Sequence, residues 1–180
     1  LLVMPQDIQA PKGRLILPQQ QTIRDILEAG AVSIVLKEDG LAKALPALGK
    51  KPRIVITDSQ VFGSVAKDTP EDILLTSFSI LFARYKGNLG PLVKGAAALK
   101  HIGAGDKILI SEGCTHHRQC NDIGTVKLPG WIRQYTGVEP EFHFTSGTGF
   151  PDDLSGYSLI VHCGGCMLNE REMKYRMECA

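Results

Sequence analysis

The stretch Arg53-Ile54-Val55-Ile56-Thr57 decides the fold, because it is a short run of β-branched apolar residues with a helix start directly behind it. Such a run is typical of a strand that is buried on both faces of a parallel sheet. Asp58-Ser59 follows as a cap for a helix that we predict over residues 60–66. A strand followed at once by a helix is the repeating unit of a parallel α/β sheet.

The same alternation continues outward from this stretch. Further strands are predicted at residues 1–4, 31–36, 107–110, 141–145 and 158–161. Further helices are predicted at residues 17–29, 41–48, 92–101 and 168–177, with one or two short helices over 122–135 interrupted by Pro129-Gly130. Asp68-Thr69-Pro70 indicates a boundary. We therefore predict two small parallel-sheet, Rossmann-like α/β domains in tandem, one over residues 1–72 and one over residues 73–180.

Composition argues against several classes of protein. The 180 residues include 43% apolar and 22% charged side chains, with a net charge of +1, as in ordinary globular chains. No basic stripe indicates nucleic-acid binding, and no apolar run approaches the roughly 18 residues that a membrane span needs. No targeting segment precedes the first strand, so we expect a cytoplasmic location. The chain opens at Leu1 inside an apolar run, and we interpret it as part of a longer polypeptide.

Cysteine and histidine are confined to the second predicted domain. It contains all five cysteines and all five histidines of the chain. An odd number of cysteines argues against a disulfide framework, and the spacing Cys163-x-x-Cys166 indicates metal or redox chemistry.

Three loops follow predicted strands in this domain. They are Cys114-Thr115-His116-His117, Ser146-Gly147-Thr148-Gly149 and Cys163-Gly164-Gly165-Cys166. The carboxyl ends of parallel strands lie on one edge of a sheet, and ligands bind at that edge. We therefore expect the loops to converge, although Cys114 and Cys163 are 49 positions apart.

Converging thiolates favour a metal centre. Cys114, Cys163 and Cys166 could ligate an iron–sulfur cluster, whose fourth iron would take His116, Cys120, Asn121, His162, Asp122, water or an incoming ligand. Three cysteines and one histidine are also a tetrahedral zinc set, typical of a zinc-stabilised interaction domain. A CxxC thiol oxidoreductase and cysteines that only pack in the core are two further interpretations.

Two catalytic patterns are absent from the sequence. It contains no G-x-x-x-x-G-K-[ST] phosphate loop, and it shows no catalytic arrangement of serine, histidine and carboxylate. We therefore predict that this chain is not itself an enzyme.

The motifs together resemble those of the HydF family of hydrogenase maturation factors. The pattern Cys114-x-His116, about 45 residues, then His162-Cys163-x-x-Cys166 is similar to the family signature. Further similarity lies in residues 10–19 (APKGRLILPQ), 82–87 (FARYKG), 122–124 (DIG), 127–129 (KLP) and 167–169 (MLN). The resemblance covers nearly the whole chain.

The resemblance implies a scaffold and carrier for iron–iron hydrogenase maturation. The family has a GTPase domain, a dimerisation domain and a cluster-binding domain, and this chain would hold the second and third. Cys114, Cys163 and Cys166 would ligate a 4Fe-4S cluster, with His116 and His162 as ligands or supporting groups. A di-iron subcluster precursor would be the transient cargo. Its partners would be radical-SAM maturases, apo iron–iron hydrogenase and a second copy of the chain.

The resemblance leaves the fourth cluster ligand open. Relatives often place acidic residues before Asp122-Ile123-Gly124, where this chain has Cys120-Asn121. Self-association has a physical reason of its own, because a small parallel sheet in the first domain leaves an edge strand that a two-fold partner could cover.

Overall fold

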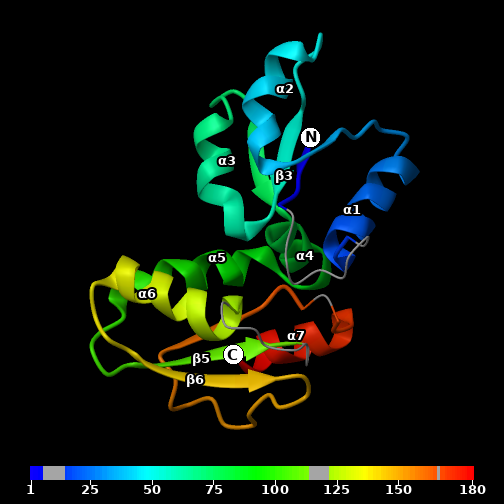
Figure 1. Cartoon of the computed structure of the whole chain (residues 1–180). Coiled ribbons are helices and arrows are strands. Elements are labelled where there is room, and N and C mark those ends of the chain that lie inside the picture. The colour runs from blue at the N-terminus through cyan, green and yellow to red at the C-terminus, as the bar shows by residue number, and fades with distance from the viewer. Residues whose placement is uncertain (6–14, 114–121, 166) are drawn as a thin grey trace. The chain divides into compact units, whose positions relative to one another are not determined.

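The chain divides into two compact units, Leu1–Leu81 and Phe82–Ala180, in a computed structural model that describes residues 1–5, 15–113, 122–165 and 167–180 (Figure 1). The sequence predicts a boundary between residues 72 and 73. The strand that follows it, β4 (Leu74–Ser77), pairs with β3 (Ile54–Thr57) of the first unit. The structural division therefore falls later, within helix α4 (Phe78–Lys86).

Both units are α/β, and every strand pairing among the described residues is parallel, which confirms the predicted fold class. The sheet of the first unit has the order β2-β1-β3-β4. Its two shortest strands are β1 (Leu2–Val3) and β2 (Val35–Leu36). Its helices are α1 (Leu17–Glu28), α2 (Leu41–Ala47) and α3 (Phe62–Asp68), with short 3-10 turns at Glu38–Gly40 and Ser59–Val61.

Neighbouring residues along a strand point to opposite faces of the sheet. In the first unit, both faces are apolar and helices cover both. On one face, Val3 and Val55 pack against Leu41 of α2 and Val65 of α3. On the other face, the core comes from α1, α4 and the alternate strand positions: Leu2, Met4, Ile56 and Phe78, with Ile23, Ile26 and Leu81 against them. Two thin apolar layers therefore stabilise this unit.

The sheet of the second unit has the order β6-β5-β7, with β5 (Lys107–Glu112) in the centre. Its edge strands are β6 (Glu141–Ser146) and β7 (Leu159–His162). Its helices are α5 (Leu89–Ala98), α6 (Leu128–Thr136) and α7 (Glu170–Cys179), with a 3-10 turn at Leu99–His101. Ile108 and Ile110 of β5 pack against Ile132 of α6, so the other face of β5 carries Leu109 and Ser111.

Two local predictions differ from the structure, and one apolar run for which no element is predicted from the sequence holds two. The strand predicted at 31–36 is reduced to Val35–Leu36, and Val32 is 90% exposed. The apolar run from residue 73 holds both β4 and α4, which hydrophobicity alone does not separate. Pro129-Gly130 does not interrupt a helix, since a π-helical turn at Ile123–Lys127 passes into α6 before it. Pro129 is the second residue of α6, and Gly130 lies inside the same helix.

Within the described residues, each helix is too short or too polar to serve as a membrane span.

We expect Leu41→Ala to lower the free energy of unfolding by about 2–5 kcal/mol, because Leu41 is 0% exposed and its loss leaves a cavity between α2 and the sheet. Leu27→Ala, on the same unit but 64% exposed, is the matched control and should change it by less than about 0.5 kcal/mol. Urea denaturation measures both. Equal losses would contradict this assignment of the core.

Candidate functional site

The three strands of the second unit end at one edge of the sheet. Register aligns Glu112 at the end of β5 with Ser146 at the end of β6. It also aligns Ser111 with His162, the last residue of β7. The residues that follow each strand therefore begin at the same edge, as the sequence predicts for the three loops.

Cys163 lies directly against the end of β5. Its Sγ accepts a hydrogen bond from the Gly113 backbone N–H at 3.0 Å, and its own N–H donates to the Ser111 carbonyl at 3.0 Å. The thiol is free and half-buried. Gly113 immediately precedes Cys114 in the sequence, so the chain enters the predicted Cys114 loop beside the Cys163 sulfur.

Of the predicted site residues, the structure describes Cys163 and His162. The others lie outside the described residues: Cys114, His116, Cys120, Asn121 and Cys166. In the described part of the chain, no three histidine, cysteine or acidic side chains form a group that could hold a metal ion. The predicted set draws two of its three thiolates from Cys114 and Cys166, so it stays a prediction.

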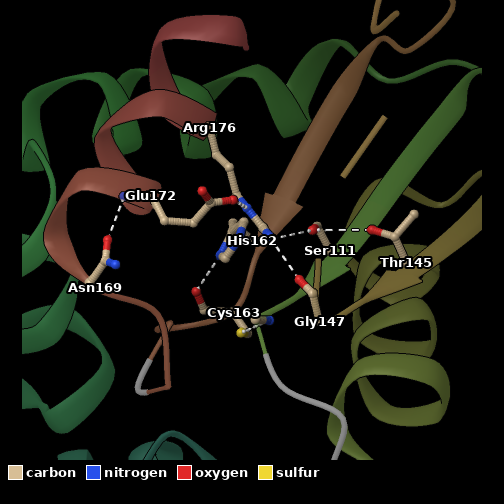
Figure 2. A network of polar contacts seen from close by, with 9 residues as sticks. Ser111, Thr145, Gly147, His162, Cys163, Asn169, Glu172 and Arg176 are labelled. Atoms are coloured by element: carbon tan, nitrogen blue, oxygen red, sulfur yellow. Dashed lines mark hydrogen bonds and ion pairs between the residues drawn. The ribbon is translucent and has the colours of Figure 1, made fainter. Parts of the chain in front are cut away.

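Arg176 of α7 joins the ends of all three strands (Figure 2). Its Nη1 donates to Ser111 Oγ of β5 at 3.4 Å, and its Nη2 donates to the carbonyl of Gly147, just after β6, at 2.7 Å. Nη1 also lies 3.1 Å from Nε2 of His162 at the end of β7. The planar guanidinium presents its N–H donors in a fixed fork, which suits three acceptors held by three strands.

The charge of Arg176 is buried but compensated. The side chain is only 2% exposed, and Nε donates to Oε1 of Glu172, one turn earlier on α7, at 2.8 Å. The guanidinium carbon lies 5.0 Å from the ring centroid of Phe150, a cation–π contact. Burial of a charge is costly unless it is paired and hydrogen-bonded, and here each nitrogen has a partner.

His162 is held as a neutral ring. Arginine can only donate, so Nε2 of His162 accepts from Arg176, and Nδ1 carries the proton and donates to the Cys163 carbonyl at 2.7 Å. Burial is the main cause that lowers the pKa of His162, and the Arg176 guanidinium adds to it; the bond to Cys163 and the Glu172 carboxylate oppose it. In this arrangement neither ring nitrogen offers a lone pair to a metal.

A second buried cation holds the other end of the Cys163 loop. Lys86, at the end of α4, is 7% exposed and lies over the Phe82 ring. Its Nζ donates to the Gly165 carbonyl at 2.9 Å and to the Leu168 carbonyl at 2.7 Å. Arg176 therefore contacts the start of the loop at His162, and Lys86 contacts it at Gly165 and Leu168.

Neither Arg176 nor Lys86 is among the site residues predicted from the sequence. Lysine and arginine on helices are mostly exposed, so neither residue type predicts burial. One signal was present for Lys86, because it lies in the FARYKG segment at 82–87 beside Gly87. A Cβ at Gly87 would lie 2.6 Å from Sδ of Met177, so this glycine allows the end of α4 to approach α7.

Two buried carboxylates flank the undescribed residues 114–121. Asp122 caps the π-helical turn, with Oδ2 accepting from the Thr125 N–H at 2.8 Å and the Thr125 hydroxyl at 3.0 Å. Glu112 packs so closely on Gly124 that a Cβ there would lie 1.9 Å from Oε1. Both carboxylates thus fix the chain on either side of residues 114–121.

We expect Gly165→Ala to be more destabilising than Gly105→Ala. Both glycines have positive φ, which costs an alanine about 1–2 kcal/mol. A Cβ at Gly165 would also lie 2.5 Å from Sδ of Met173, whereas Gly105 has no atom within 4 Å. Overpacking adds about 1–3 kcal/mol. Urea denaturation compares the two variants, and equal losses would refute the close packing of the loop on α7.

Comparison with known families accounts for nearly the whole chain. Residues 1–87 match the Hydrogen maturase F dimerization domain, and residues 91–180 match the Hydrogen maturase F tetramerization domain. A search of curated proteins gave no match. The family resemblance carried by the cysteine and histidine motifs is thereby confirmed: the chain belongs to the hydrogen maturase F (HydF) family.

Proposed function

We propose that this chain is a self-associating scaffold in hydrogenase maturation and that its second unit binds a 4Fe-4S cluster through Cys114, Cys163 and Cys166. The observation that carries the proposal is the bond from the Gly113 N–H to Cys163 Sγ, because it brings the chain before Cys114 to the Cys163 thiol. Membership of the HydF family supports the same role.

The surroundings of Cys163 suit an iron–sulfur cluster. Backbone N–H bonds to cluster sulfurs and nearby charges are among the factors that set the reduction potential. A cluster on three thiolates is anionic, and the buried cations Arg176 and Lys86 both contact the loop that would hold it. The N-terminus of α7, capped by Asn169, begins a few residues after Cys166 and adds a partial positive charge.

Three thiolates leave one iron for another ligand. Because both nitrogens of His162 are in hydrogen bonds, we propose that His162 orients Cys163 and that the fourth ligand comes from His116, Cys120, Asn121 or an incoming molecule. An exchangeable iron would anchor a di-iron precursor supplied by radical-SAM maturases and passed on to apo iron–iron hydrogenase. The chain would perform this role by binding and transfer rather than by catalysis, in the cytoplasm.

We expect Cys163→Ser to abolish cluster assembly, because it removes one of the three proposed thiolates. Cys179→Ser is the matched control, since Cys179 is free and exposed at the end of α7. Iron analysis and electron paramagnetic resonance after anaerobic reconstitution measure both variants. Full iron content and an unchanged spectrum in Cys163→Ser would refute the cluster.

The same preparation separates the proposal from its rivals. A brown protein whose resonance shifts on addition of imidazole or cyanide supports a cluster with one open iron. A colourless protein with bound zinc indicates a zinc-stabilised interaction domain. Disulfide turnover without metal indicates a thiol oxidoreductase that uses Cys163 and Cys166.

For self-association, we propose that a second copy meets the edge at β2, which among the described strands pairs with β1 alone. The N–H groups of Leu2 and Met4 donate to the carbonyls of Ile34 and Leu36, so the backbone of Val35 between them faces away from β1. Val32, Ile34 and Val35 are all exposed apolar residues beside this edge. An unpaired apolar edge strand is a template for pairing with another chain.

We expect Val35→Lys to reduce the mass of the assembly, because a two-fold axis at this edge would bring two like charges close together. Leu74→Lys, at an exposed position on the opposite edge strand β4, is the matched control and should leave the assembly intact. Sedimentation at micromolar concentration measures both. A monomeric parent chain, or equal behaviour of the two variants, would refute the β2 interface.

A further inference from the structure

Buried cations from two different helices hold the loop after β7 from both ends: Arg176 of α7, whose contacts Figure 2 shows, and Lys86 of α4. We propose that Arg176 and Lys86 are positioning residues that fix the Cys163 loop in its ligand-bearing shape in the metal-free chain. This inference rests on the proposed cluster site, and it assigns to these two side chains a role that the cysteine and histidine motif does not contain.

Arg176 fixes the upstream end. Its guanidinium orients His162 through Nε2, and His162 in turn donates to the Cys163 carbonyl. The same guanidinium bonds to Ser111 Oγ, which also accepts from the Thr145 hydroxyl at 3.1 Å. The Arg176 guanidinium therefore fixes the position of the Cys163 peptide relative to the ends of all three strands.

Lys86 fixes the downstream end. Gly165 has φ +60°, and its carbonyl accepts both from Lys86 Nζ and from the Leu168 N–H at 3.0 Å. The second bond of Lys86, to the Leu168 carbonyl, holds the entry to α7. The Lys86 ammonium thus bonds to both ends of the turn from Gly165 to Leu168, which leads into the α7 cap residue Asn169.

The choice of acceptors indicates positioning rather than stability. Burial of a charge costs free energy, and well-packed apolar residues often replace buried ion pairs without loss of stability. Lys86 donates to the loop carbonyls of Gly165 and Leu168. Beside its ion pair with Glu172, Arg176 donates to the Gly147 carbonyl, to His162 and to Ser111 at the ends of the strands. Both cations therefore hold the loops at the sheet edge in place.

The test uses amide hydrogen exchange on the metal-free chain. Arg176→Met should raise exchange severalfold in residues 146–150 and 162–165, and Lys86→Met should raise it severalfold at Gly165 and Leu168. Arg133→Met is the control for Arg176, because Arg133 also pairs with a glutamate at 2.7 Å and lies 4.9 Å from a phenylalanine ring, but on the surface. Lys174→Met, which breaks an exposed pair with Glu170, is the control for Lys86.

Exchange that stays at the parent level in these segments, or that rises equally across the whole second unit, would overturn the proposal. If Arg176→Met does not fold, Arg176→Lys carries the same test, since an ammonium keeps the charge but cannot reach all three strands. Lys86→Arg serves the same purpose for Lys86.

A second readout uses the reconstituted cluster. Loss of either cation should move the midpoint potential to more negative values and change the resonance spectrum, whereas Arg133→Met and Lys174→Met should match the parent. A spectrum and potential unchanged in both Arg176→Met and Lys86→Met would overturn the proposal. A parent chain that binds no iron would refute the cluster instead, and the exchange measurement would still decide whether the cations position the loop.

Discussion

The guanidinium of Arg176 is the interaction on which the candidate site depends. In a parallel sheet, the chain crosses from the end of each strand back to the edge where the next strand begins. The hydrogen bonds between the strands do not fix the loops that follow them relative to one another. Arg176 supplies that link, because its one planar group bonds to β5, to the residue behind β6 and to the last residue of β7. The peptide that carries Cys163 is therefore placed by a side chain from α7, which lies outside the sheet.

The two units share an architecture and differ in what they bury. The first unit is filled by apolar residues on both faces of its sheet, with buried polar side chains that are uncharged, such as Thr57. All the buried charged side chains among the described residues lie in the second unit: Lys86, Glu112, Asp122 and Arg176. The described part of the first unit thus has an apolar core without buried charge, whereas the second unit bears the cost of buried charge around one sheet edge.

Sequence patterns predict most of this fold, since apolar runs and helix caps are local signals. They locate the strands at Arg53–Thr57 and Lys107–Ile110, and the rule for parallel strands then places Cys163 at the edge beside β5. They miss β4, because its apolar run continues into α4 without a break in hydrophobicity. They also miss Arg176 and Lys86, since burial of a cation is decided by tertiary contacts, which for Lys86 with Gly165 and Arg176 with Ser111 join residues 79 and 65 positions apart.

The order of strands in the second sheet has a consequence for biosynthesis. Central strand β5 is made first, but its neighbours β6 and β7 come from later segments, so translation must proceed past His162 before the sheet can close. Parallel strands that are far apart in the sequence pair slowly, because the chain loses conformational entropy when the loop closes, before the stabilising contacts form. A nascent chain that still lacks Arg176 cannot join the three strand ends. The loops at this sheet edge consequently reach their described arrangement late, after the ribosome has released enough of the polypeptide to include α7.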